Sequence, residues 1–154
     1  MTTLHFTKTT TATPEQLLAA LTDFGPGRSE VFPNSHDDQL QVHDRGTDYA
    51  DVTEGGGGAW ERLHYDWSDP RRVVMTTTDS NAWGGKSGHI YTFTPLPDGR
   101  TRVDATVVRD GKNVKGKFFA ILFKVVGRKV LGGAFQETVR AIEARSDEQS
   151  TQTA

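Results

Sequence analysis

The last third of the chain, residues 115–145, has a long and largely apolar helical pattern, and it follows a run of strand-like segments. The other clear helical pattern comes directly after the first strand-like segment. A sheet with an apolar face needs a cover, and a long closing helix can supply it. We therefore expect an α+β fold in which a curved antiparallel seven-stranded sheet wraps around the long C-terminal helix, with room for a ligand between them.

The first helix has a well-defined start. Thr13 can accept a hydrogen bond from the backbone, Pro14 supplies the φ angle of a first helical residue, and Gln16 can close a capping box onto Thr13. Apolar residues follow at helical spacing up to Phe24, and the next segment, Gly25-Pro26-Gly27, ends the helix. A second short helix is expected around residues 28–32.

Alternation of apolar and polar residues indicates seven strands, at residues 3–11, 39–42, 49–53, 60–67, 73–78, 89–95 and 101–109. Most of the connections are short, and residues 96–99 read as a hairpin turn, which predicts an antiparallel meander. We expect one ligand-binding domain over residues 1–145. Residues 146–154 contain no apolar residue except the terminal alanine and are expected to form a disordered tail.

Charge and composition exclude several functions. The 154 residues include 18 basic and 20 acidic ones, so the net charge of −2 offers no general attraction to nucleic acid. The absence of cysteine excludes disulfides, thiolate nucleophiles and cysteine-bound metals. Apolar runs are too short for stable membrane insertion, and the first residues lack the features of a signal peptide. These observations predict a cytoplasmic protein, for which we favour a monomer.

Motifs for cofactors and metals fail on inspection. Gly85-Lys86-Ser87 resembles the end of a phosphate-binding loop, but Ser80 stands where glycine is required and a strand follows instead of a helix. His36, Asp37 and Asp38 are adjacent and lack the spacing of helical metal ligands. We expect neither a cofactor nor a metal.

Four segments carry a family resemblance: residues 13–18 with Leu21-Thr22-Asp23, the turn at 69–73, the hairpin at 91–103 and the helix end at 137–143. Together they resemble the START/Bet v 1-like superfamily, and within it the polyketide cyclase/dehydrase-like group. The resemblance implies a helix-grip fold whose cavity binds lipids, sterols, polyketides or other apolar molecules. The segment that is usually rich in tryptophan after the first helix contains no tryptophan here, at residues 26–33.

Alternation also predicts which side chains face the cavity, if the apolar rows of the sheet face the helix. The expected ligand-binding residues are Tyr65, Trp67, Met75, Thr77, Tyr91, Phe93 and Val103 from strands, and Phe119, Leu122, Phe123 and Val126 from the helix. Polar groups in a mostly apolar pocket are candidates for catalysis. They are His89, Glu61, Tyr65 and Tyr91. The alternative is that these aromatic residues fill the core and that His89 lies in water.

The first half of the C-terminal helix is apolar around its whole circumference, so a sheet cannot cover all of residues 118–126. Either loops and short helices cover the rest, or this part of the helix is a flexible portal wall. The neighbouring lysines either form a solvated face or contact anionic lipid.

Three functions remain open. The first is binding of an apolar or aromatic small molecule between sheet and helix. The second is a cyclase or aromatase acting on a polyketide-like substrate with the polar residues named above. The third is a protein-interaction module, similar to chaperone-activating relatives, that uses the apolar part of the helix.

Overall fold

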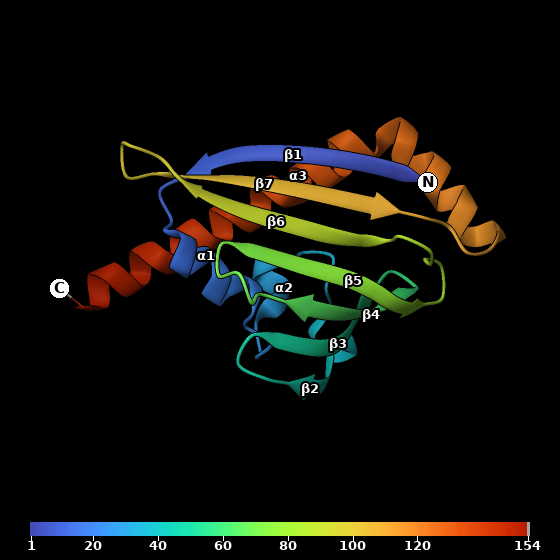
Figure 1. Cartoon of the computed structure of the whole chain (residues 1–154), viewed down its shortest axis with the longest axis horizontal. Helices are drawn as coiled ribbons and strands as arrows, with labels where there is room; N and C mark the ends of the chain where they lie inside the picture. Colours follow the sequence, from blue (N-terminus) through green and yellow to red (C-terminus); the bar gives the residue numbers. More distant parts are fainter. Residues whose placement is uncertain (154) are drawn as a thin grey trace.

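A seven-stranded antiparallel sheet organises the chain, as the computed structural model of residues 1–153 shows (Figure 1). The strands lie in the order β1-β7-β6-β5-β4-β3-β2, so β2 to β7 form a meander and β1 adds to its far edge. This arrangement confirms the predicted sheet. The bounds are β1 Thr2–Thr10, β2 Gln41–Arg45, β3 Tyr49–Gly56, β4 Ala59–Asp66, β5 Arg72–Ser80, β6 Gly88–Pro95 and β7 Thr101–Arg109.

Two register shifts interrupt the ladders of the sheet. One lies between Val42 and Asp44 in the β2–β3 pair, and the other lies between Arg62 and Leu63 in the β4–β5 pair. Such bulges increase the local twist of a sheet. The shift in the β4–β5 pair leaves Thr78 of β5 as the extra residue, and it falls one residue beyond Glu61, which lines the cavity described below.

The short helices α1 Pro14–Leu21 and α2 Arg28–Val31, with the 3-10 turn η1 Asp37–Gln39, connect β1 to β2. The predicted capping box is present: Gln16 N donates to Thr13 Oγ1 at 3.2 Å and Thr13 N donates to Gln16 Oε1 at 2.9 Å. Gly27 precedes α2 with a φ of 87°, a conformation that side chains other than glycine rarely adopt. These elements cover part of the sheet.

The closing helix, α3 Val114–Thr153, runs along the sheet beside β1 (Figure 1). Phe135, Val139 and Ile142 are buried in the main core, as an amphipathic helix on a sheet requires. The helix continues over residues 146–153, for which the sequence predicts a disordered tail; residue 154 lies outside the described part. Ser146 is buried and donates to Ile142 O at 2.8 Å. Adding residues to an existing helix avoids the cost of nucleating a new one, which favours this extension.

The first part of α3 packs on a second, smaller core. This core contains Ala82, Trp83 and Ala120, with Phe119 and Phe123 against it. Figure 1 shows that this part of α3 runs in a different direction from the rest of the helix. Within residues 1–153, no helix combines the length and apolar character that a membrane crossing would need.

Candidate functional site

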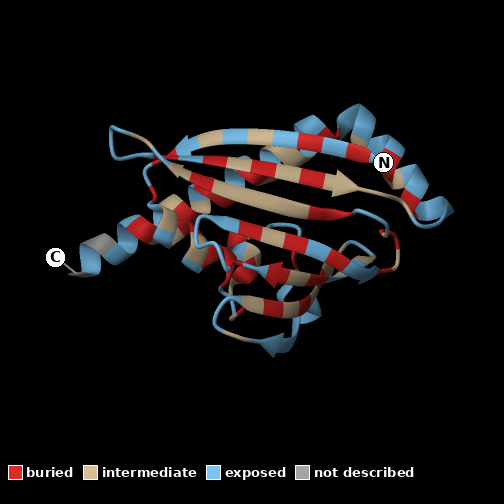
Figure 2. Ribbon diagram, in the orientation of Figure 1, coloured by how far each residue is buried: buried red, intermediate tan, exposed pale blue. Residues whose placement is uncertain are grey.

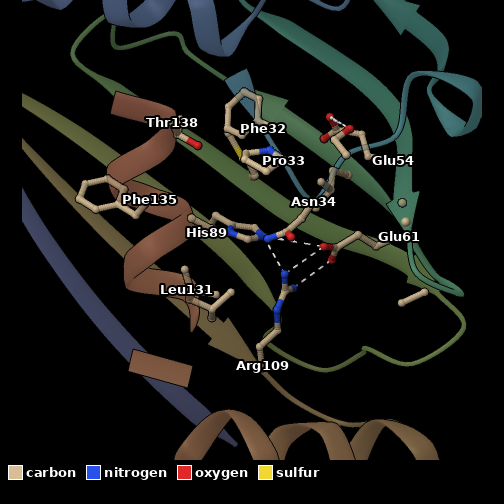
Figure 3. A pocket seen from close by; sticks show the side chains of 18 of the residues that line it. Phe32, Pro33, Asn34, Glu54, Glu61, His89, Arg109, Leu131, Phe135 and Thr138 are labelled. Atoms are coloured by element: carbon tan, nitrogen blue, oxygen red, sulfur yellow. Dashed lines mark hydrogen bonds and ion pairs between the residues drawn. The ribbon is translucent and has the colours of Figure 1, made fainter. Parts of the chain in front are cut away.

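A cavity of about 520 Å³ lies between the inner face of the sheet, α3 and the segment that follows α2. Its apolar wall combines side chains from strands, α3 and the connecting segment: Phe6, Phe32, Leu63, Met75, Trp83, Val107, Phe119, Phe123, Leu131 and Phe135. Figure 3 shows that the labelled residues of α3 face polar side chains on the opposite wall. A largely apolar wall with few polar groups is typical of small-molecule sites.

The first polar cluster brings together side chains from three strands, β4, β6 and β7. Arg109, the last residue of β7, donates from Nη1 and Nη2 to the two carboxylate oxygens of Glu61 in β4, each at 3.1 Å. The Nη2 atom also lies 3.0 Å from Nε2 of His89 in β6 (Figure 3). The same Nε2 atom lies 3.7 Å from Glu61 Oε1, so the His89 imidazole contacts both the carboxylate and the guanidinium. The guanidinium also lies 5.0 Å from the ring centroid of Trp83.

The Glu61 carboxylate stays ionised in this setting. Burial by itself would raise the pKa of Glu61, but Arg109 and His89 together outweigh burial and hold that pKa well below its usual range. Thr77 Oγ1 also donates a hydrogen bond to Glu61 Oε2 at 2.9 Å, so the carboxylate has a further partner. Glu61 is therefore a paired anion and has no proton to give at neutral pH.

A second polar cluster is centred on Glu54 of β3. Arg28 Nε donates to Glu54 Oε1 at 2.5 Å, Ser35 Oγ donates to the same oxygen at 3.3 Å, and the Tyr65 hydroxyl donates to Oε2. Arg28 Nη2 donates in turn to the Tyr65 hydroxyl at 2.9 Å. Burial, together with the Glu54 charge, raises the pKa of Tyr65 well above its usual value, so the phenol remains protonated.

Arg28 belongs to the segment that departs from the resembled family. Its guanidinium lies 4.6 Å from the ring centroid of Phe24 and 4.5 Å from that of Phe32, and its Nη1 donates to the carbonyl oxygens of Leu21 and Asp23. A buried cation between two rings and two carbonyls is fully paired. This segment thus closes one wall with an arginine and phenylalanines.

Tyr91 places a hydroxyl group on the cavity wall. Its side chain lines the cavity, and its hydroxyl makes no hydrogen bond with any residue in the described part of the chain. Burial raises the pKa of Tyr91 to about 12, so this hydroxyl can donate at any physiological pH. It is a polar anchor that a ligand can use.

The structure brings together seven of the residues that the sequence singled out. The expected ligand-binding residues on the cavity wall are Tyr65, Met75, Tyr91, Phe119 and Phe123, and the catalytic candidates Glu61 and His89 lie there too. The strand residues among them share the face of the sheet that turns toward α3. Period-two alternation was sufficient to find them.

Six other expected ligand-binding residues do not line this cavity. Trp67, Phe93 and Val103 fill the main core, since their strand ends lie beyond the cavity. Thr77 is buried and bonded to Glu61. Leu122 and Val126 are 42% and 41% exposed, because the side of α3 that carries them points away from the sheet.

Several cavity residues were missed by the sequence reasoning. Arg109 continues the alternation of Val103, Ala105 and Val107, so its side chain was expected on the same face of the sheet, toward the cavity. Glu54 continues the buried row of β3 in the same way. Residues 32–36 gave no such signal, because a loop has no fixed period. Among the described residues, no group of three or more histidine, aspartate or glutamate side chains is arranged to hold a metal ion.

Comparison with solved structures shows the same fold at low sequence identity. The protein TTHA0849 from Thermus thermophilus is 15% identical, with 97% of this chain and 99% of that chain covered and a TM-score of 0.73. The Zhui aromatase/cyclase from Streptomyces sp. R1128 is 14% identical, with coverage of 97% and 95% and a TM-score of 0.72. A START superfamily protein from Mycobacterium smegmatis is 13% identical, with coverage of 96% and 98% and a TM-score of 0.67.

Sequence comparison identifies the family independently of the fold. No curated protein matches the sequence significantly. Residues 1–147 match the family described as polyketide cyclase / dehydrase and lipid transport. With nearly the whole chain covered and the helix-grip fold in place, this chain belongs to the polyketide cyclase / dehydrase and lipid transport family.

Proposed function

We propose that this chain binds a neutral, mainly aromatic molecule, lipid-like or polyketide-like, in the cavity between the sheet and α3. The observation that carries the proposal is the Tyr91 hydroxyl, which is protonated and has no hydrogen-bond partner among the described residues, while the carboxylates of the wall, Glu61 and Glu54, are paired. A hydroxyl left free in such a place is available to a carbonyl or hydroxyl group of a ligand. The cavity volume of about 520 Å³ suits a drug-sized molecule.

The charges on the wall support a neutral ligand. Each carboxylate of the two polar clusters is matched by one guanidinium: Glu61 by Arg109 and Glu54 by Arg28. The charges of these two carboxylates and two guanidiniums therefore cancel. An anionic ligand would have to leave water without a free cation to receive it, which costs several kcal/mol.

A matched pair of fluorescent probes tests the proposal. N-phenyl-1-naphthylamine is neutral, and 8-anilino-1-naphthalenesulfonate has a similar aromatic body with a negative charge. We expect the neutral probe to bind at least about tenfold more tightly, because the sulfonate finds no unpaired cation. Native mass spectrometry of freshly purified protein would reveal any co-purified neutral molecule.

Two tryptophan variants show whether the probe occupies the cavity. Ala134 lines the cavity, so Ala134→Trp should fill it and remove the bound probe. Ala144 is exposed on the same helix, so Ala144→Trp should leave probe binding unchanged. Equal binding in both variants would place the probe elsewhere and contradict the proposal.

A second candidate function is catalysis of the aromatase/cyclase type. It is favoured by His89, which lies on the cavity wall with Tyr91 and contacts both Arg109 and Glu61. Histidine is the side chain that most often acts as a general acid or base in enzymes. Turnover of an aromatic polyketide that is lost in His89→Ala, with neutral-probe binding intact, would favour this function over binding alone.

A further inference from the structure

The first half of α3 carries an exposed apolar face. Seven of the ten exposed large hydrophobic side chains in the described chain lie here, and we call them the apolar stripe: Val114, Phe118, Ile121, Leu122, Val125, Val126 and Val130. Phe118 is 63% exposed and Val125 is 77% exposed. Figure 2 shows exposed residues along this part of the helix. Exposed apolar groups gathered on one helix indicate an interaction surface.

The stripe is accompanied by positive charge alone. Residues 114–136 contain the bases Lys115, Lys117, Lys124, Arg128 and Lys129 and no acidic residue. All five are exposed. Within the part of the chain that the structure describes, none of them forms an ion pair. The first acidic residue of α3 is Glu137, so a basic segment stands out against a net charge of −2 for the whole chain.

We propose that the apolar stripe and its five bases dock this protein onto the surface of an anionic lipid bilayer. Apolar side chains flanked by basic ones suit the boundary between acyl chains and negative headgroups. The helix would lie in the interface plane without crossing the bilayer. Long lysine stems can extend along the apolar face while their ammonium groups reach the headgroups.

The composition of this face favours lipid over a protein partner. Four of the five bases are lysines, and lysine is depleted in protein–protein interfaces, whereas tyrosine, tryptophan and arginine are enriched. The stripe contains neither tyrosine nor tryptophan. A second copy docked face to face would place lysines against lysines with no acid to pair them.

The docked face adjoins the cavity. Val130 is 56% exposed and also lines the cavity, so the cavity reaches the surface beside the stripe. Phe119 and Phe123 line the cavity from the inner side of the same helix. If the ligand is apolar, as the proposed function holds, docking would let it pass between bilayer and cavity with little exposure to water.

Vesicle co-sedimentation of the ligand-free full chain tests docking separately from cavity binding. We expect binding to phosphatidylcholine vesicles that contain phosphatidylserine, at least about tenfold weaker binding to pure phosphatidylcholine, and loss of binding in high salt. Phe118→Glu/Val125→Glu and Lys124→Glu/Arg128→Glu should each reduce binding at least about tenfold. All four positions are exposed, so the fold should persist, as circular dichroism can verify.

Matched controls lie on other elements. Val42 is 47% exposed on β2, and Arg71 is exposed in the turn between β4 and β5. Val42→Glu and Arg71→Glu should leave vesicle binding unchanged. Absence of binding, equal binding to both vesicle types, or equal loss in the controls would overturn the proposal. A dimer in light scattering that Phe118→Glu dissolves would assign the face to a second copy instead and would also overturn it.

Discussion

Arg109 and Glu61 form a two-pronged ion pair, with each terminal nitrogen of Arg109 3.1 Å from one carboxylate oxygen of Glu61. Both side chains are largely buried, at 11% and 14% exposure. We expect Glu61→Gln to lower the free energy of unfolding at pH 7 by about 3 kcal/mol, because it leaves a buried guanidinium without its counter-charge. Urea unfolding measures this change. Glu137→Gln, at an exposed position, should change stability by less than about 0.5 kcal/mol.

The same pair makes stability depend on acid. The pKa of Glu61 is depressed in the folded state, so its contribution is fully present above its unfolded pKa of about 4.3 and is lost as the pH falls through the folded value. The stability difference between the wild type and Glu61→Gln should therefore shrink below about pH 4. A difference that stays constant down to pH 2 would contradict this assignment.

Arg28 is the buried cation of the second cluster, with 1% of its side chain exposed. Arg28→Met should lower the free energy of unfolding by about 3 kcal/mol or more, because Glu54 loses its counter-charge and the Leu21 and Asp23 carbonyls lose a donor. The double variant Arg28→Met/Glu54→Gln should recover part of this loss. An unchanged urea midpoint for Arg28→Met would show that the pair contributes nothing.

Tyr91→Phe removes one hydroxyl and leaves the ring. We expect its affinity for 2-naphthol to fall by roughly tenfold, the effect of about one lost hydrogen bond, while its affinity for naphthalene is unchanged. Isothermal titration calorimetry with both compounds makes this comparison. With a pKa of about 12, Tyr91 stays protonated, so the wild-type preference should be the same at pH 6 and pH 8. Equal losses for both compounds would mean that Tyr91 acts by packing alone.

Two glycines of α3 should respond to alanine in opposite directions. A Cβ at Gly116 would lie 1.9 Å from the Ala82 carbonyl oxygen, so Gly116→Ala must push the start of α3 off the loop after β5. We expect it to destabilise the protein by about 1–3 kcal/mol. A Cβ at Gly133 meets nothing within 4 Å, and Gly133→Ala should stabilise the helix by about 0.5–1 kcal/mol. Thermal unfolding of both variants would show opposite shifts, whereas equal shifts would contradict the close contact at Gly116.

Most of the fold could be predicted because its signals are local. The capping box of Thr13 and Gln16 spans four residues, and strand alternation needs only a short window. The far end of α3 could not be predicted in this way. Residues 146–153 have a polar composition, and they continue a helix whose earlier residues Phe135, Val139 and Ile142 are packed in the core.

The candidate site could be predicted only in part. Parity indicated which strand residues point inward, but it did not show how far along each strand the cavity extends. Phe93 and Val103 share the face of Tyr91 and Ala105, yet they lie in solid core. Helical spacing likewise could not say which side of residues 118–126 faces the sheet, since every side is apolar.

The sequence alone determined the number of strands, their antiparallel arrangement and the closing helix, since these follow from interactions between near neighbours in the chain. Only the tertiary structure decided which polar groups form hydrogen bonds or ion pairs with other residues and which do not. Glu61 and Arg109 are 48 residues apart, and they meet because the registers of β4 through β7 bring their ends together. Buried charges must find partners across such distances, whereas the Tyr91 hydroxyl lies on the cavity wall with no hydrogen-bond partner among the described residues.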